Sequence, residues 1–331
     1  MTLGCEAVTE ILDALDAGER ERVAALRAEG RFFWLDVSLG ETSRDDLAAA
    51  LDPPEHALRA LRATGDPRQS RMLLADGASI GFALRCYARS EAPPNGAGSR
   101  LRPLWVRVVL TSDYLLTLHE ERVSLPAVLA PELPAGRSRR YAVYSVLDAM
   151  LASAFDALEE LELTLDALAA TWTGDDGAPV PRSALQDTGA SLATMRRWVT
   201  AEQAAFGRLG VEVRALRGFD ADEESFFDRL DEQVHHLLAS IDAAANGMGM
   251  LLDLQLNRRA YLVSVVATIF VPLTFITGFF GMNFGWMVDR LDGPAVFLLL
   301  GLLVPIVTAA LAWRLLVRRV LSGEAPSGRR R

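Results

Sequence analysis

The stretch AYLVSVVATIFVPLTFITGFFGMNFGW, residues 260–286, decides the architecture of this chain. It lies in a run, 260–288, that contains no Asp, Glu, Lys, Arg or His, and a second uncharged run follows at 293–313. A helix needs about 20 apolar residues to cross roughly 30 Å of hydrocarbon. The sequence therefore predicts two membrane-spanning helices, joined by a turn that begins at Gly281-Met282-Asn283.

Charge is distributed unevenly along the chain. Residues after 259 carry a net charge of +4, whereas residues 1–259 carry −13. An acidic body argues against nucleic acid as a partner. The negative charge is consistent with a domain that attracts divalent cations, although it is also what an ordinary soluble domain would carry.

Arginines flank the two uncharged runs on one side only. Arg258 and Arg259 precede the first run, and Arg314, Arg318 and Arg319 follow the second. The positive-inside rule then places both termini in the cytoplasm. The N-terminus lacks a basic region followed by an apolar stretch, so we expect no signal peptide. The expected location is the inner (plasma) membrane, with the lipid bilayer as a partner.

The first part of the chain, 1–130, reads as a cytoplasmic α/β domain in which helices flank a sheet. The expected helices are 1–30, 43–51 and 54–63, and the expected strands are 31–38, 71–74, 80–87, 104–110 and 114–118. The fold class is therefore α+β, with long helices after the sheet.

Helical periodicity dominates from residue 131 onward. Residues 131–221 predict an antiparallel pair of long helices, and 222–259 a stalk helix. Apolar residues recur along the stalk at alternating spacings of three and four: Phe227, Leu230, Val234, Leu237, Ile241, Ala244, Met248 and Leu251. We interpret this seam as a surface that gathers copies of the chain around an axis. The alternative is a helix that packs on its own domain. A two-helix pore domain, 260–318, and a basic tail, 319–331, complete the chain.

Two helices cannot enclose a water-filled path, so conduction requires a homo-oligomer. Small or mildly polar residues form one stripe along the first span, and they predict either a pore wall or a close helix interface. These candidates are Asn257, Ser264, Val271, Thr274 and Gly278. At the end of the span, a ring of Asn283 amide oxygens would hold a hydrated cation weakly enough to release it. Gly281 would let the backbone turn closely.

At this point the residues resemble a known family. Residues 272–284, PLTFITGFFGMNF, look like the signature of CorA-type divalent metal ion (magnesium/cobalt) transporters, a family that includes a ZntB-like zinc branch. Segments 34–37, WLDV, and 116–120, LTLHE, fall where that family has similar strands. The resemblance extends over nearly the whole chain.

The resemblance implies a homopentameric funnel with a central pore that the first span lines. It implies Gly281, Met282 and Asn283 as the entrance filter, and Asn257, Val271 and Thr274 as pore-lining positions. It also implies Mg²⁺ as the substrate and as a regulatory ligand between cytosolic domains, with no other cofactor.

The sequence departs from that pattern in the outer loop and in the pore. Val271 stands where relatives carry Met, and the loop 285–292 lacks the Met-Pro-Glu-Leu continuation. Asp289 and Asp292 in this loop would concentrate cations at the mouth, or are simply solvated acids. Asp222 and Glu223 at the stalk's tip would sense cytosolic metal, or form a solvated acidic helix start.

The sequence favours a channel-like transporter of Mg²⁺, and also of Co²⁺ and Ni²⁺, driven by the electrochemical gradient. The alternatives are a Zn²⁺ transporter of the same family and a membrane-anchored cation sensor that does not conduct. His235 and His236 point about 100° apart on a helix and cannot both face one zinc ion well. We find no phosphate-binding GxxxxGK[ST] motif and no nucleophile–base motif, so we expect no enzyme.

Overall fold

The computed structural model divides into two compact units, Met1–Met248 (unit 1) and Gly249–Arg331 (unit 2), which are described separately. It describes residues 10–13, 15–40, 42, 44–51, 53, 73–89, 101–133, 138–173, 181–219, 226–282 and 293–321. The predicted helix 54–63 lies outside these residues. The domain boundaries expected at 130, 221, 259 and 318 stay predictions.

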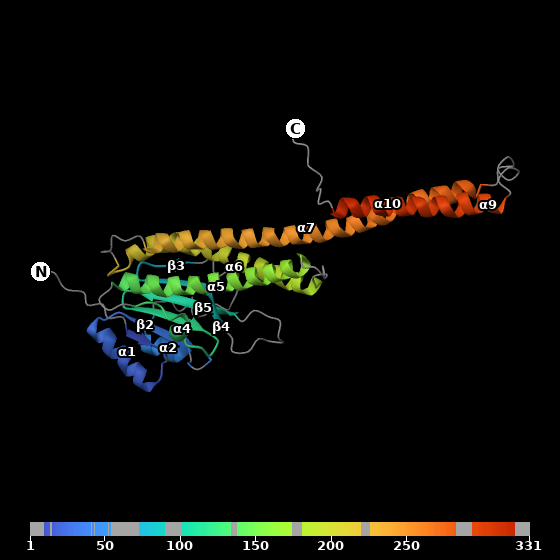
Figure 1. Cartoon of the computed structure of the whole chain (residues 1–331). Helices are drawn as coiled ribbons and strands as arrows, with labels where there is room; N and C mark the ends of the chain where they lie inside the picture. Colours follow the sequence, from blue (N-terminus) through green and yellow to red (C-terminus); the bar gives the residue numbers. More distant parts are fainter. Residues whose placement is uncertain are drawn as a thin grey trace. The chain divides into compact units, whose positions relative to one another are not determined.

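A mixed six-stranded sheet forms the centre of unit 1 (Figure 1). Its strands are β1 Glu10–Leu12, β2 Phe33–Ser38, β3 Leu74–Ala75, β4 Ser79–Arg89, β5 Leu101–Thr111 and β6 Tyr114–His119. The spatial order is β1-β2-β6-β5-β4-β3. β1, β2 and β6 run parallel, and the remaining pairs are antiparallel. An α/β domain with a sheet and long helices was predicted, and this is confirmed.

The N-terminal strand corrects the sequence prediction. Residues 1–30 were expected to be helical, yet β1 at Glu10–Leu12 pairs in parallel with β2, and only then does α1, Ala17–Glu29, begin. The Asp16 side chain caps α1 by accepting a hydrogen bond from the Glu19 N–H at 2.9 Å. A strand of three residues has too little local pattern to be recognised, because its identity comes from its pairing with β2.

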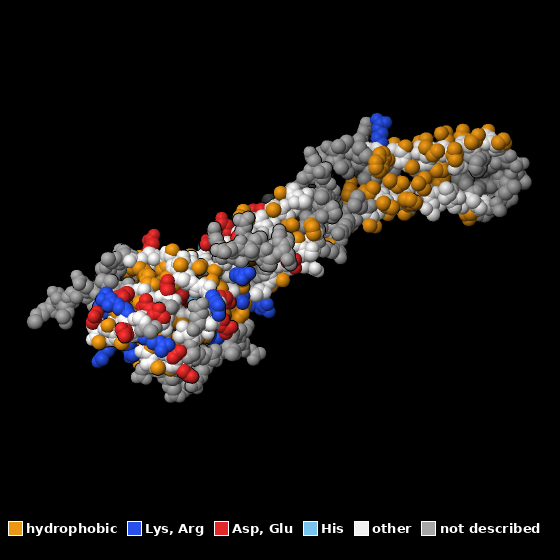
Figure 2. All heavy atoms as spheres, turned by 90° about the horizontal axis from the view of Figure 1, so that it is seen from below, with side chains coloured by type: hydrophobic (Ala, Val, Ile, Leu, Met, Phe, Trp, Pro, Cys, Tyr) orange, Lys and Arg blue, Asp and Glu red, His pale blue; other side chains and the backbone are white. Residues whose placement is uncertain are grey.

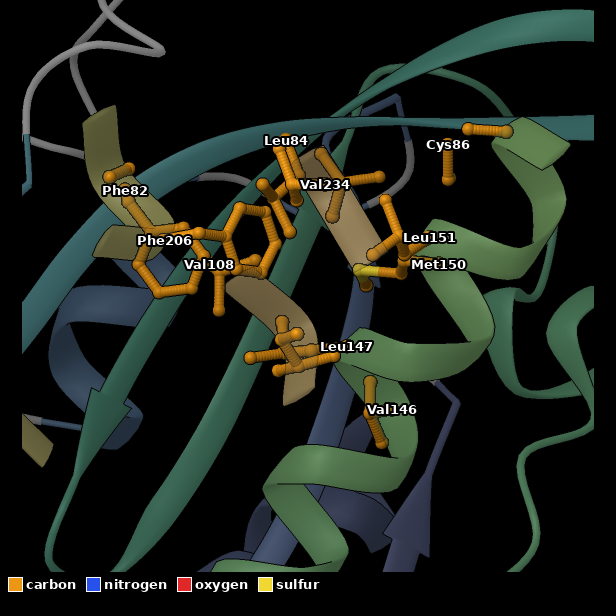
Figure 3. Packing of buried hydrophobic residues seen from close by; sticks show 14 of the residues in the cluster. Phe82, Leu84, Cys86, Val108, Val146, Leu147, Met150, Leu151, Phe206 and Val234 are labelled. Atoms are coloured by element: carbon orange, nitrogen blue, oxygen red, sulfur yellow. The ribbon is translucent and has the colours of Figure 1, made fainter. Parts of the chain in front are cut away.

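Successive side chains of a strand point to opposite faces of the sheet, and both faces are buried here. Phe33, Leu35 and Val37 of β2 pack with α1 and with α2, Arg44–Leu51, in one core. Trp34 points to the opposite core, which contains α5, Arg139–Thr173, α6, Arg182–Ala215, and the first part of α7, Phe226–Phe280. Figure 3 shows the packing of this second core. The short helix α4, Leu125–Leu129, also contributes to it through Leu125.

The heptad seam of α7 corrects a second prediction. Leu230, Val234, Leu237 and Ile241 are each 0% exposed and belong to the core that α7 shares with α5, α6 and the sheet. The seam was interpreted as a surface that gathers copies around an axis. The alternative, a helix packed on its own domain, is the one the structure shows, because the chain itself buries these side chains.

Side chains from α5 and α6 cover the open edge of β4. Of the described strands, β3 pairs with β4 only at Ile80 and Gly81. Farther along, the Arg85 N–H donates to Glu202 Oε1 at 2.7 Å, and the Tyr87 N–H donates to Ser153 Oγ at 2.9 Å. Glu202 is buried, and burial raises its pKa to about 8, although the Arg85 N–H bond opposes this. The edge is therefore satisfied by two helices rather than left for another strand.

Unit 2 contains the rest of α7 and a second helical segment. This segment consists of α9, Pro294–Val296, a wider π-helical stretch, η3, Phe297–Leu303, and α10, Val304–Leu321. Pro305 has no N–H to donate to the Gly301 carbonyl, and the Val304 N–H donates to the carbonyl of Leu299, five residues back. The proline thus accounts for the local change of helix type.

Candidate functional site

Unit 2 exposes apolar side chains. On α7, Val263, Phe270 and Phe275 are 70%, 63% and 72% exposed, and Leu298 and Ile306 in the second segment are 58% and 57% exposed. Figure 2 shows hydrophobic side chains covering the visible part of this unit, whereas red and blue charged groups gather on unit 1. Soluble monomers rarely expose so large an apolar surface. It marks a surface that other chains or lipid must cover.

Among the residues that the structure describes, three helical stretches are long and apolar enough to cross a membrane: Arg139–Thr171, Phe226–Asn257 and Pro294–Leu311. Val263–Phe279 is a shorter apolar stretch of α7. The first and last of these stretches differ most in burial. In Arg139–Thr171, 61% of the most apolar 18-residue segment is buried, but in Pro294–Leu311 only 6% is buried. The sheet of unit 1 explains the apolar character of the former. Within the described residues, nothing explains the apolar character of Pro294–Leu311.

The predicted pore-lining residues share one side of α7. Asn257, Ser264, Val271 and Gly278 recur every seven residues, about two helical turns, and Thr274 lies three residues beyond Val271. All five are exposed in the single chain. They form a narrow stripe of small and neutral groups. Their part in a pore stays a prediction.

The threonine hydroxyls of this segment bond to their own helix. Thr268 Oγ1 donates to the Ser264 carbonyl at 2.8 Å, and Thr274 Oγ1 donates to the Phe270 carbonyl at 2.8 Å. Thr277 Oγ1 donates in the same way to the Leu273 carbonyl at 2.9 Å. A hydroxyl that donates its proton still has acceptor lone pairs. Thr274 therefore offers a neutral oxygen, and no charge, along the stripe.

Pro272 and Gly281 shape the end of α7. Pro272 has no N–H for the carbonyl of Thr268, which leaves that oxygen without its usual helical donor. The last turn closes when the Gly281 N–H donates to the Thr277 carbonyl at 2.9 Å. A Cβ at Gly281 would lie 3.1 Å from that oxygen, closer than side chains normally approach. Glycine is therefore favoured where the helix ends and the Gly-Met-Asn turn begins.

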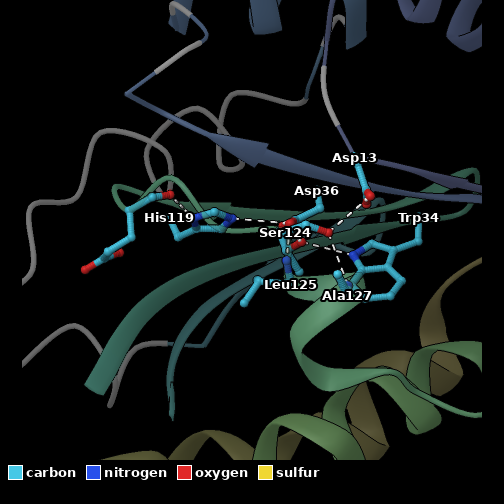
Figure 4. Close-up of polar contacts among 9 residues, drawn as sticks. Asp13, Trp34, Asp36, His119, Ser124, Leu125 and Ala127 are labelled. Atoms are coloured by element: carbon cyan, nitrogen blue, oxygen red, sulfur yellow. Dashed lines mark hydrogen bonds and ion pairs between the residues drawn. The ribbon is translucent and has the colours of Figure 1, made fainter. Parts of the chain in front are cut away.

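A buried polar network joins the two strand segments that resemble the CorA-type family, 34–37 and 116–120 (Figure 4). Asp36 of β2 accepts hydrogen bonds from Thr117 Oγ1 at 2.5 Å and from the Leu125 N–H at 2.8 Å. His119 Nε2 lies 3.3 Å from Asp36 Oδ2. Burial lowers the pKa of His119, but the hydrogen bond and charge of Asp36 outweigh it and raise the pKa overall. The network joins β2, β6 and the start of α4, which is a structural role.

Among the described residues, no group of three or more His, Cys, Asp or Glu side chains is placed to hold a metal ion. His235 Nδ1 lies 2.8 Å from the Asp231 carbonyl and its Nε2 lies 2.8 Å from Gln203 Nε2, whereas the His236 ring packs against Phe155. The two histidines thus make separate contacts. Along the stripe from Asn257 to Gly278, a cation would meet neutral oxygens.

Strands β2 to β6 of unit 1 and the helices of unit 2 up to residue 319 lie within one family match. A family model described as "CorA-like Mg2+ transporter protein" matches residues 29–319. The chain belongs to this family. The match includes both family-like strand segments, which the structure brings together: β2 and β6 pair in parallel with Asp36 opposite Thr117.

Curated relatives of this CorA-like chain are named zinc transporters. It is 31% identical over 138 residues to the zinc transport protein ZntB of Pectobacterium carotovorum subsp. carotovorum, and 26% identical over 140 residues to that of Yersinia pestis. Each match covers 40% of this chain and 42% of the relative. The chain thus matches about two fifths of the length of these relatives.

Solved structures support the fold of the CorA-like chain. The full-length CmaX protein superposes with a TM-score of 0.55 at 19% identity, covering 86% of this chain and 87% of that one. The complete CorA magnesium transporter from Methanocaldococcus jannaschii gives a TM-score of 0.53 at 15% identity, with 85% and 89% covered. At such low identity the likeness shows the fold alone.

Several predicted site residues lie outside the described residues. They are Asn283 of the entrance filter, Asp289 and Asp292 of the outer loop, and Asp222 and Glu223 of the stalk's tip. Of the filter, Gly281 and Met282 are described, and both are exposed. The sequence reasoning missed the buried Glu202, because an acid that precedes a glutamine on a long helix reads as a solvent-facing residue.

Proposed function

We propose that this chain transports divalent metal cations across a membrane, through a pore that several identical copies surround. One observation carries the proposal: the apolar surface of the uncharged segment of α7, with Val263, Val271 and Phe275 at least 66% exposed. Water does not solvate such a surface well, whereas lipid and neighbouring copies would cover it. Membership of the CorA-like family supports the same activity.

The lipid bilayer is the proposed environment of unit 2, and the inner membrane its location. Arg258 and Arg259 before one span and Arg314 after the other favour cytoplasmic termini. Unit 1, which holds most of the acidic charge, would then face the cytoplasm.

The pore wall is proposed to be the stripe that contains Ser264, Val271 and Thr274. Two helices from one chain cannot enclose a path, so copies must associate, and five is the number that the family resemblance implies. Asn283 is the proposed entrance filter, with Gly281 and Met282 completing its turn. Asp289 and Asp292 are proposed to raise the cation concentration at the mouth. A neutral stripe binds a divalent ion weakly, as conduction requires.

Mg²⁺ is the first candidate for the transported ion, together with Co²⁺ and Ni²⁺. A hydrated Mg²⁺ keeps most of its water and needs only weak acceptors. Entry into a cell with an inside-negative potential would gain about 4.6 kcal/mol per 100 mV for two charges. Cytosolic Mg²⁺ held by Asp222 and Glu223 is the proposed regulator of closure.

Zn²⁺ is the second candidate, because the curated relatives carry the name zinc transport protein. The described part of the chain has no cluster of His, Cys or acidic ligands for a bare Zn²⁺. A zinc transporter built this way would also have to pass the ion with much of its water.

The test is ion flux into liposomes that contain the purified full-length chain. Uptake of Mg²⁺, Co²⁺, Ni²⁺ and Zn²⁺ is compared at equal concentration, with and without a proton gradient, against protein-free liposomes. Uptake led by Mg²⁺ supports the first candidate, and uptake of Zn²⁺ alone supports the second. Cation binding without any flux would make the chain a membrane-anchored sensor and overturn transport.

A further inference from the structure

A pocket of about 490 Å³ lies in unit 1 between α4, α5 and the β4–β5 edge. One face of α5 forms its floor with small residues, Ser145, Ala149, Ala152 and Ser153. Ala149 lies four residues after Ser145, and Ala152 and Ser153 lie three and four residues after Ala149, which places them on one face of the helix. The pocket is therefore elongated along α5, and its volume lies within the range typical of small-molecule sites.

Two carboxylates of α5 accompany this floor: Asp148 precedes Ala149, and Asp156 lies three residues beyond Ser153. Asp148 and Asp156 both line the pocket, and Glu132 adds a third acid from the segment after α4. Asp148 Oδ1 is held in place by the Tyr144 hydroxyl at 3.1 Å and by Gln233 Nε2 at 2.9 Å. None of the described lining residues is Lys, Arg or His. The described lining is thus negative at two separated points.

Tyrosine rings complete the walls. Tyr141, Tyr144 and Tyr87 line the pocket. The Tyr144 ring stacks on Phe226 with centroids 5.1 Å apart, and Tyr141 meets the same ring edge-on at 5.5 Å. These contacts fix the ring positions. Aromatic faces attract alkylammonium groups and also pack against methylene chains.

The spacing of the acids decides the class of ligand. Asp148 and Asp156 are eight residues apart on α5, so their Cα atoms are separated by about 12 Å. One metal ion cannot bridge two such carboxylates, because metal–oxygen bonds are about 2–2.6 Å long. A flexible chain with a positive charge at each end can reach both. We propose that this pocket binds a linear polyamine, with an ammonium group at each aspartate and its methylene chain over the small-residue floor.

The proposal does not depend on transport, and its test measures binding alone. Spermidine is titrated into the full-length protein in detergent by isothermal calorimetry, at fixed ionic strength and without divalent cations. We expect saturable binding that Asp156→Asn weakens at least about tenfold, because one charge-assisted contact is lost. Among the residues that the structure describes, no hydrogen bond or ion pair joins the exposed Asp156 to another group, so this change leaves the fold intact.

Glu159→Gln is the matched control, since it removes the same charge from an exposed position on α5 outside the pocket. We expect it to leave the dissociation constant unchanged. Equal weakening by Asp156→Asn and Glu159→Gln would mean nonspecific attraction to an acidic surface and overturn the proposal. Displacement of spermidine by an equal concentration of Mg²⁺ would also overturn it, because the pocket would then be a metal site.

A second pair of variants tests the aromatic walls. Tyr141→Phe keeps the ring and should bind spermidine as the unmodified chain does, whereas Tyr141→Leu should bind about three- to fivefold more weakly. A shorter amine, 1,3-diaminopropane, should also bind more weakly than spermidine, because it cannot span the two aspartates. Equal affinity for both amines would contradict the two-ended arrangement.

Discussion

The two parts of α7 belong to different units and differ in what covers their apolar side chains. In unit 1, Leu230, Val234 and Leu237 are 0% exposed, because the sheet and the helices of the same chain pack over them. In unit 2, Val263 and Phe275 are 70% and 72% exposed. Apolar periodicity is present in both parts. It predicts a helix with a contact face, but it does not say whether the partner is the same chain, another copy or lipid.

The largest effect should follow from a charge placed in the covered part. Leu237→Asp would bury an unpaired carboxylate, and we expect it to destabilise unit 1 by at least about 4 kcal/mol. Ala239→Asp adds the same charge at an exposed position of the same helix and should leave folding unchanged. The check is thermal unfolding of the full-length protein followed by circular dichroism. A variant that melts normally but no longer assembles would show that the seam joins copies after all.

The next effect concerns the uncovered part and the Gly-Met-Asn turn at its end. Asn283→Ala should reduce divalent cation uptake into liposomes to the protein-free level, because the proposed ring of amide oxygens is lost. The matched control is Asn246→Ala, which removes the same side chain from an exposed position of α7 in unit 1. It should transport normally. Normal flux in Asn283→Ala, with assembly intact, would remove this residue from the pathway.

An effect of pH on stability should be confined to unit 1, where Glu202 of α6 is buried. Its pKa of about 8 lies above the ordinary value of 4.5. Between these two pH values the folded state therefore holds a proton that the unfolded state releases. Its contribution to stability is present below about pH 4.5 and declines as the pH rises to about 8, by about 1.4 kcal/mol per pH unit. His119, whose pKa is also raised, adds to the same direction. Glu202→Gln should flatten the dependence of Tm on pH between 5 and 8, and an unchanged slope would contradict the assignment.

The smallest effect compares a glycine that faces open space with a glycine that lies against a neighbouring helix. A Cβ at Gly247 of α7 meets nothing within 4 Å, so Gly247→Ala should stabilise the helix by about 0.5–1 kcal/mol. A Cβ at Gly210 of α6 would lie 3.3 Å from the Phe227 Cβ, so Gly210→Ala should gain less or lose stability. Paired Tm measurements check this. A larger gain at Gly210 would contradict the close packing of α6 on α7.

The candidate site was only partly accessible to sequence reasoning. The stripe from Asn257 to Gly278 was found because its members lie on one helix, where spacing alone sets the face. The pocket beside α5 was missed, because its walls come from α4, α5 and two strands that are distant in sequence. The Asp36–His119 pair was missed for the same reason: its partners lie 83 residues apart.

The sequence by itself determined the local features of this protein: the uncharged helices, the alternating strands, and the turn that begins at Gly281. These features arise from backbone geometry and from the absence of charge, which act between near neighbours. Tertiary structure alone decided that Glu10–Leu12 is a strand, that the seam of α7 faces its own sheet, and that Glu202 covers the edge of β4. Those outcomes depend on which distant surface satisfies a hydrogen bond or removes apolar area from water, and no local pattern contains that choice.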